Sequence, residues 1–149
     1  MRSASVDVGS ERVASIGRGL VVLVGVGTDD RPEDGERLAS KVAALRIFDD
    51  DAGKMSRSVS DAGGAVLAVP QFTLYADVRG GRRPDFTHAA PPDRGARLYD
   101  AFCGALRGRA LSVEAGRFGA HMVVTLEGDG PVTVVTSTDG WAEGDIGRG

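Results

Sequence analysis

The chain has 149 residues, of which 42% are hydrophobic and 26% are charged. Its formal net charge of −3 excludes a global electrostatic attraction to nucleic acid, so any RNA contact must come from a local basic patch. One Cys and two His exclude an internal disulfide and leave too few ligands for a typical structural zinc site. No apolar run approaches the roughly 18 residues of a membrane span, so we expect a single-domain protein of the reducing cytoplasm with no metal and no membrane partner.

The first third of the chain predicts three strands and one helix. Residues 3–8 alternate apolar and polar side chains, and residues 13–16 provide a hairpin partner. Residues 20–26 predict a fully apolar strand. Asp30, with a glutamate three residues later, resembles a capping box, so a helix is expected from there to about Leu45.

The next segment raises a structural question. Residues 65–75 are rich in strand-forming side chains, yet Pro70 and Gln71 interrupt them. A proline is tolerated in a sheet only at an edge, at a strand start or at a bulge, and a buried glutamine needs hydrogen-bond partners. Either the chain bends here, or its backbone is held open for another purpose.

The remaining elements complete the pattern of an α+β domain. A second helix is expected from about Asp93 to Leu106, and the tail 138–149 is expected to be mobile. Further short strands are predicted at 46–48, 111–115, 121–127 and 131–136. Because short turns join several strands, antiparallel pairing should dominate. We expect an α+β fold in which a mainly antiparallel curved sheet or partial barrel carries two packed helices.

Conventional catalytic motifs are absent from the sequence, which has no G-x-S-x-G elbow, no phosphate-binding loop and no H-E-x-x-H. Gly25 and Gly27 lie between a strand and a helix, as a dinucleotide site requires, but Asp30 takes the third glycine position. A carboxylate there would face the pyrophosphate, so a capped strand-to-helix turn is favoured over a nucleotide site.

Two other segments have chemical potential. Gly130-Pro131 precedes an apolar run, and from the residues alone a trans proline that opens a strand is favoured, although an X-Pro bond costs only about 0.5 to 1 kcal/mol to make cis. The glycine would also allow main chain to approach a ligand closely. Arg79, Arg82 and Arg83 surround two glycines, and their guanidinium groups are candidate phosphate contacts, although surface loops are often charged without binding anything.

These segments together resemble a known family. Gln71-Phe-Thr-Leu-Tyr75, followed by Gly80-Gly-Arg-Arg-Pro84, and Gly130-Pro-Val-Thr133 are similar to the two signature motifs of the D-aminoacyl-tRNA deacylases. The resemblance covers residues 3–136, with supporting stretches in order at 19–26, 45–48, 53–55, 89–92 and 118–120. Residues 1–137 are therefore expected to form one deacylase-like domain, without the first strand that family members usually have.

The resemblance implies a cofactor-independent enzyme that hydrolyses the ester joining a D-amino acid, or glycine mischarged on tRNA-Ala, to the 3′ end of tRNA. It assigns Gln71, Phe72 and Thr73 to the catalytic pocket, where main-chain N–H groups would hold the developing oxyanion. Thr73 is more simply a pocket-lining residue than a nucleophile. The family's main-chain wall excludes L-amino acids.

The family also implies a homodimer with active sites at the subunit interface. A cis Gly–Pro peptide of one subunit enters the pocket of the other, so the substrate-binding residues would be Gly130, Pro131, Val132 and Thr133. The contacts to tRNA phosphates would come from Arg79, Arg82 and Arg83. Pro70 replaces the family's usual serine and His121 its usual Asp or Gln, so a weakened relative that binds aminoacyl-tRNA ends without turnover is the alternative hypothesis.

Overall fold

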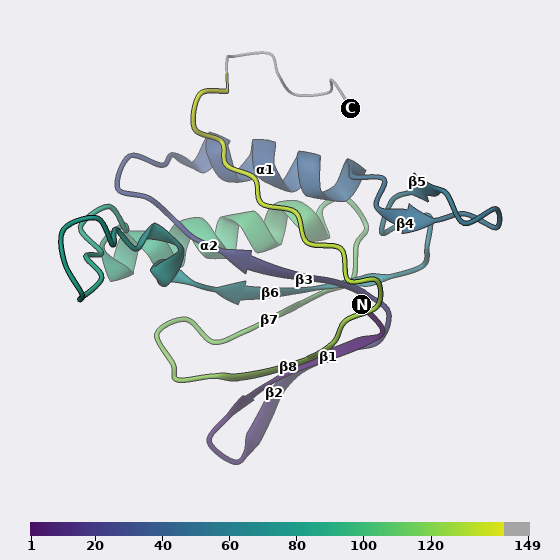
Figure 1. The fold of residues 1–149 in the computed structure, drawn as a ribbon, viewed down its shortest axis with the longest axis horizontal. Helices are drawn as coiled ribbons and strands as arrows, with labels where there is room; N and C mark the ends of the chain where they lie inside the picture. Colours follow the sequence, from purple (N-terminus) through teal and green to yellow (C-terminus); the bar gives the residue numbers. More distant parts are fainter. Residues whose placement is uncertain (142–149) are drawn as a thin grey trace.

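The computed structural model describes residues 1–141, which form two sheets and a helical layer (Figure 1). Helices α1 (Pro32–Ala44) and α2 (Pro92–Arg107) cover one face of a sheet with the strand order β3-β6-β7. The strands of this sheet are β3 (Gly19–Val24), β6 (Ala65–Pro70) and β7 (Val113–Ala115). A second sheet, of order β2-β1-β8, lies on the other side and consists of β1 (Ser3–Val8), β2 (Glu11–Ile16) and β8 (Val123–Glu127). A separate hairpin contains β4 (Phe48–Asp49) and β5 (Met55–Arg57).

The two sheets differ in the direction of their strands. β1 pairs antiparallel with β2 and with β8, and β4 pairs antiparallel with β5, whereas β6 pairs parallel with β3 and β7. The predicted α+β class with two packed helices is confirmed, and no closed barrel forms among residues 1–141. The parallel sheet was not anticipated, because parallel neighbours need long crossovers, which α1 and α2 supply.

The apolar run at 65–69 reflects the central position of β6. Val66 and Ala68 pack in the core beneath the helices, whereas Leu67 and Val69 pack against β1 and β2, and all four are at most 1% exposed. Successive side chains of a strand point to opposite faces. A strand that is covered on both faces must therefore be apolar throughout, without the alternation seen in β1.

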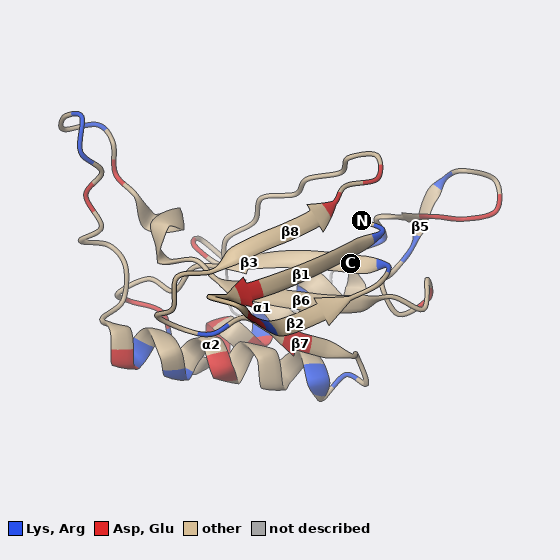
Figure 2. Ribbon diagram, turned by 90° about the horizontal axis from the view of Figure 1, so that it is seen from below, with Lys and Arg blue, Asp and Glu red and all other residues tan. Residues whose placement is uncertain are grey.

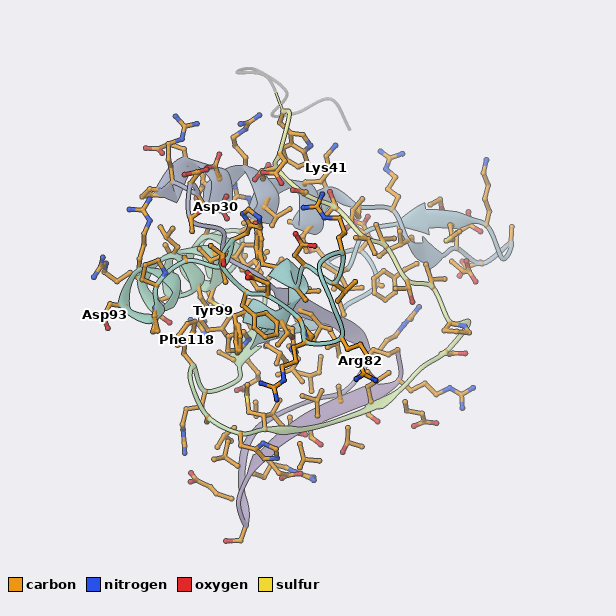
Figure 3. The ribbon with its side chains drawn as sticks, turned by 60° about the vertical axis from the view of Figure 1, so that its left-hand side comes forward. Asp30, Lys41, Arg82, Asp93, Tyr99 and Phe118 are labelled. Atoms are coloured by element: carbon orange, nitrogen blue, oxygen red, sulfur yellow. The ribbon has the colours of Figure 1, made fainter. Side chains whose placement is uncertain are left out.

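Tyr99 joins α2 to the central strand. Its ring is buried and lies 6.2 Å from the ring of Phe118 (Figure 3). Its hydroxyl donates a hydrogen bond of 2.9 Å to the main-chain oxygen of Ala68. Burial raises the pKa of Tyr99, so the hydroxyl keeps its proton and remains a donor.

Two strand predictions are wrong. The interrupted strand expected across 65–75 ends at Pro70, which has no N–H to donate to a neighbouring strand, and a 3-10 helix, η1 (Phe72–Tyr75), follows it. The strand expected at 131–136 is absent from the described chain. That segment instead runs from the end of β8 toward α1 (Figure 1), where the Arg37 guanidinium lies 5.5 Å from the Trp141 ring. Most of the tail expected to be mobile, residues 142–149, lies outside the described residues.

Candidate active site

The three predicted catalytic residues lie on an exposed turn after β6. Gln71 is the N-cap of η1, and Phe72 and Thr73 are its first two residues, with Phe72 57% exposed. The Gln71 N–H donates to the Val24 carbonyl oxygen at 2.8 Å, which extends the contact between β3 and β6 by one residue. The Gln71 side-chain amide donates to the Thr73 hydroxyl. The turn is thus anchored through its main chain while the side chains of Phe72 and Thr73 are exposed.

Two main-chain donors of this turn are unused. The N–H groups of Phe72 and Thr73 have no acceptor within residues 1–141, whereas the Leu74 N–H bonds to the Gln71 oxygen. This pattern follows from helix geometry, since the first N–H groups of any helix have no partner inside it. Adjacent free N–H groups on an exposed turn are a suitable arrangement for stabilising an oxyanion.

The arginines of the following loop differ from one another. Arg79 makes a 2.7 Å ion pair with Asp77, and this hydrogen-bonded partner lowers the pKa of Asp77 to about 2. Arg82 and Arg83 are exposed and have no ion-pair partner in the part of the chain that the structure describes. The loop extends away from both sheets with its basic residues at the tip (Figure 2). It offers two free guanidinium groups beside the candidate site.

A hollow of ≈ 560 Å³ lies next to the predicted catalytic turn. Its lining includes Tyr75 of η1, His88, Asp139 and the turn at 27–30. The segments 71–73 and 130–133 are not among its lining residues, so the hollow begins just after the predicted catalytic residues. Within residues 1–141, no group of three or more His, Cys, Asp or Glu side chains is arranged to hold a metal ion.

Gly25 and Gly27 serve packing rather than nucleotide binding. A Cβ on Gly25 would lie 3.1 Å from Tyr75 Cε2, and a Cβ on Gly27 would lie 2.8 Å from the Tyr75 hydroxyl. The tyrosine ring therefore packs against both glycines, and the interpretation as a strand-to-helix turn is confirmed. Sequence reasoning missed the partner of these glycines, although a glycine within an apolar strand pattern can mark the close approach of another chain segment.

The predicted cap of α1 is wrong by one residue. The N-cap is Arg31, whose N–H donates to the Asp34 carboxylate at 2.8 Å. The Asp30 carboxylate instead accepts the N–H of Gly27, also at 2.8 Å. The Asp30 carboxylate therefore stabilises the turn beside Tyr75 rather than the start of the helix.

The second signature segment lies far from the first within one chain. The Gly130–Pro131 peptide is cis, so the trans interpretation favoured from the residues alone is wrong. Val132 and Val134 are 52% and 50% exposed. The turn that follows β8 lies at the opposite end of the sheets from the turn that follows β6 (Figure 1 and Figure 2). A single chain does not bring the two segments together.

No helix within residues 1–141 has the length and apolar character needed to cross a membrane.

The family model described as D-Tyr-tRNA(Tyr) deacylase matches residues 1–137. The D-aminoacyl-tRNA deacylase of Thermotoga petrophila is 57% identical over 132 residues, covering 89% of each chain. That of Thermus aquaticus is 54% identical over 134 residues, covering 90% of this chain and 88% of the relative.

Solved structures agree with this fold. The c-Myc DNA Unwinding Element Binding Protein superimposes with a TM-score of 0.83 at 40% identity, covering 89% of this chain and 91% of that one. A probable eukaryotic D-amino acid tRNA deacylase superimposes with a TM-score of 0.73 at 23% identity, covering 85% and 89%, which supports the fold alone. Because the family model spans nearly the whole described chain, the protein belongs to the D-Tyr-tRNA(Tyr) deacylase family.

Proposed function

We propose that this chain hydrolyses the ester bond of D-aminoacyl-tRNA, and of glycyl-tRNA mischarged on tRNA-Ala, to free amino acid and tRNA. The observation that carries the proposal is the high identity, over nearly the full length of both chains, to relatives named D-aminoacyl-tRNA deacylase. A tRNA substrate also favours a cytoplasmic location. The proposed reaction uses no metal or organic cofactor.

The chemistry assigned to the site is electrostatic. Water attacks the ester carbonyl carbon, the carbonyl oxygen becomes negative, and the bond to the ribose oxygen then breaks as that oxygen takes up the proton that the attacking water has lost. The free N–H groups of Phe72 and Thr73 would donate to the developing oxyanion. One such donor is typically worth about 10²- to 10³-fold in rate. Because the Thr73 hydroxyl already accepts the Gln71 amide, a lining role suits Thr73 better than nucleophilic attack.

Selection of the D-amino acid is assigned to main chain rather than to a side-chain pocket. A pocket that merely fits one methylene better discriminates by about 1 to 3 kcal/mol. A main-chain wall beside the α-carbon instead excludes an L side chain sterically and admits glycine. We assign that wall to Gly130 and Pro131 of a second subunit, with Val132 and Thr133 next to them, because the chain's own segment lies at the far end of the sheets.

A homodimer is therefore part of the proposal. Exposed apolar side chains, which a subunit interface would cover, occur on η1, on β8 and on the segment after it; they are Phe72, Leu74, Val123, Leu126, Val132, Val134 and Val135.

A charge in this surface should prevent assembly. Val134→Asp is expected to sediment at the 15.4 kDa mass of one chain and to lose turnover, whereas the unaltered protein should sediment at twice that mass. The reason is that an ionised carboxylate buried without a partner is strongly unfavourable. Met55→Asp is the matched control, because Met55 is 52% exposed but lies on the β4–β5 hairpin. A fully active monomer of the unaltered chain would contradict the interface assignment.

The activity itself is tested by mixing the purified protein with tRNA charged with D-Tyr, with L-Tyr or with glycine and measuring ester loss. Release of D-Tyr and glycine with L-Tyr spared is expected. Tight binding of charged tRNA without turnover would instead identify the alternative, a weakened relative. Pro70→Ser separates the two further, since recovered turnover would indicate drift from an active enzyme.

The loop arginines provide a second prediction about substrate binding. Arg82→Glu and Arg83→Glu are each expected to weaken tRNA binding and to reduce the slope of log Kd against log salt by about 0.7 to 0.9 per lost phosphate contact. Arg97→Glu is the control, because Arg97 is also exposed but lies on α2. Titrations of tRNA at several salt concentrations measure the slopes. Equal slopes in all three variants would show that the loop does not contact phosphate.

A further inference from the structure

The proposed catalytic turn is not anchored by buried side chains of its own. None of the four residues of η1 is buried, so its position depends on contacts at its two ends. At the start, the Gln71 N–H bonds to the Val24 oxygen, and the Phe72 ring lies 5.1 Å from the Phe86 ring. At the other end is Tyr75, which faces the strand-to-helix turn at 25–30.

Tyr75 packs closely against the strand-to-helix turn. Its ring lies over Gly25 and Gly27, where any Cβ would collide with ring atoms. Its hydroxyl lies against Gly27, whose N–H donates to the Asp30 carboxylate at 2.8 Å, and the tyrosine and the aspartate line the same hollow. Asp30 thus fixes the glycine turn on which the tyrosine packs.

Asp30 is itself held from the helical layer. It lies at the end of the loop that leads into α1 (Figure 3), and its main-chain oxygen accepts a hydrogen bond from Arg94 of α2. Burial raises the pKa of Asp30, and burial together with the nearby carboxylate raises the pKa of Tyr75 to about 12. The Tyr75 hydroxyl therefore keeps its proton at neutral pH.

We propose that Tyr75 and Asp30 are positioning residues: Asp30 fixes the glycine turn, Tyr75 packs on that turn, and together they hold η1 so that the free N–H groups of Phe72 and Thr73 stay aimed at the ester carbonyl. This inference rests on the proposed deacylase function. Neither residue touches the reacting atoms in this scheme; both act through the turn. A displacement of about 1 Å at a catalytic group can cost about 10²-fold in rate.

The test compares Tyr75→Phe, Asp30→Asn and the double variant with the unaltered protein on D-Tyr-tRNA. Each single change is expected to lower kcat about 10- to 100-fold, with KM changed by less than about twofold, because binding of the tRNA body is retained. The double variant should be no worse than the poorer single variant, since both changes weaken the packing of η1 on the same turn.

The control is Tyr99→Phe, which removes a buried tyrosine hydroxyl that bonds to the Ala68 oxygen away from the turn. Its Tm should fall while its kcat stays unchanged. A kcat loss in Tyr99→Phe equal to that in Tyr75→Phe, at matched fraction folded, would show that lost stability explains the effect of Tyr75→Phe and would overturn the inference. So would a kcat of Tyr75→Phe within about twofold of the unaltered value.

Hydrogen exchange provides a readout that does not need turnover. In Tyr75→Phe, amides at 71–77 are expected to exchange faster while those of β6 do not change. If the unaltered protein has no deacylase activity, the proposed function fails, yet this measurement still decides whether the contact holds the turn. Unchanged exchange at 71–77 would overturn the inference even in an active enzyme.

Discussion

A Phe72→Pro variant is expected to have a kcat about 10²- to 10³-fold below that of Phe72→Ala on D-Tyr-tRNA, the usual effect of removing one oxyanion donor. Both changes remove the aromatic ring and its contact with Phe86, but only proline removes the main-chain N–H. The lost N–H makes no hydrogen bond within residues 1–141, so the folded protein loses none.

The position is favourable for this substitution. Phe72 is the first residue of η1, where proline is well tolerated, and Gln71 has φ −142 and ψ 78, outside the α region that a following proline disfavours. Single-turnover kinetics at saturating enzyme measure the chemical step, and thermal unfolding checks that the two variants are equally folded. Equal rates for the proline and alanine variants would remove the Phe72 N–H from the oxyanion site.

The largest effect on stability is expected from Gly19→Ala. A methyl group on Gly19 would overlap the main-chain oxygen of Ala65, its register partner in β6, and would lie 2.8 Å from the Ala65 nitrogen. Neither backbone can move without breaking the parallel pair. We expect a loss of about 3 kcal/mol, at the upper end for overpacking, and a Tm lower by roughly 6 to 12 °C for a chain of this size.

Gly17→Ala is the matched control for that experiment. Gly17 is exposed, and a Cβ there would meet nothing within 4 Å. Its free energy of unfolding should change by no more than about 0.5 kcal/mol. Calorimetry of both variants gives the comparison, and a Gly19→Ala protein as stable as Gly17→Ala would contradict the close approach of β3 and β6.

Hydrophobic periodicity predicted most elements because each depends on local sequence. The two helices and the strands at 3–8 and 65–69 follow from the spacing of their apolar residues. The 3-10 helix at 72–75 did not follow, because Phe, Thr, Leu and Tyr favour strands and only the neighbouring turns fix the chain differently. Strand direction is decided by crossovers, which periodicity does not report.

The candidate site was likewise predicted only in part from the sequence. The resemblance identified residues 71–73 and 130–133, but no local pattern connects Gly27 with Tyr75, which are 48 positions apart in sequence and in contact in the fold. The cap of α1 was misplaced for a related reason. Asp30 has the side chain of a cap, yet its hydrogen bond with the Gly27 N–H takes it away from the helix.

The parallel sheet has a consequence for how the chain acquires its structure. The register pairs Gly19 with Ala65 and Val66 with Val113, so about 46 or 47 further residues must be synthesised after each strand before its neighbour exists. Such distant contacts slow folding, because loop-closure entropy is lost before the contacts form. During synthesis, β3 would leave the ribosome with both edges bare, and the central layer could close only once β7 had emerged.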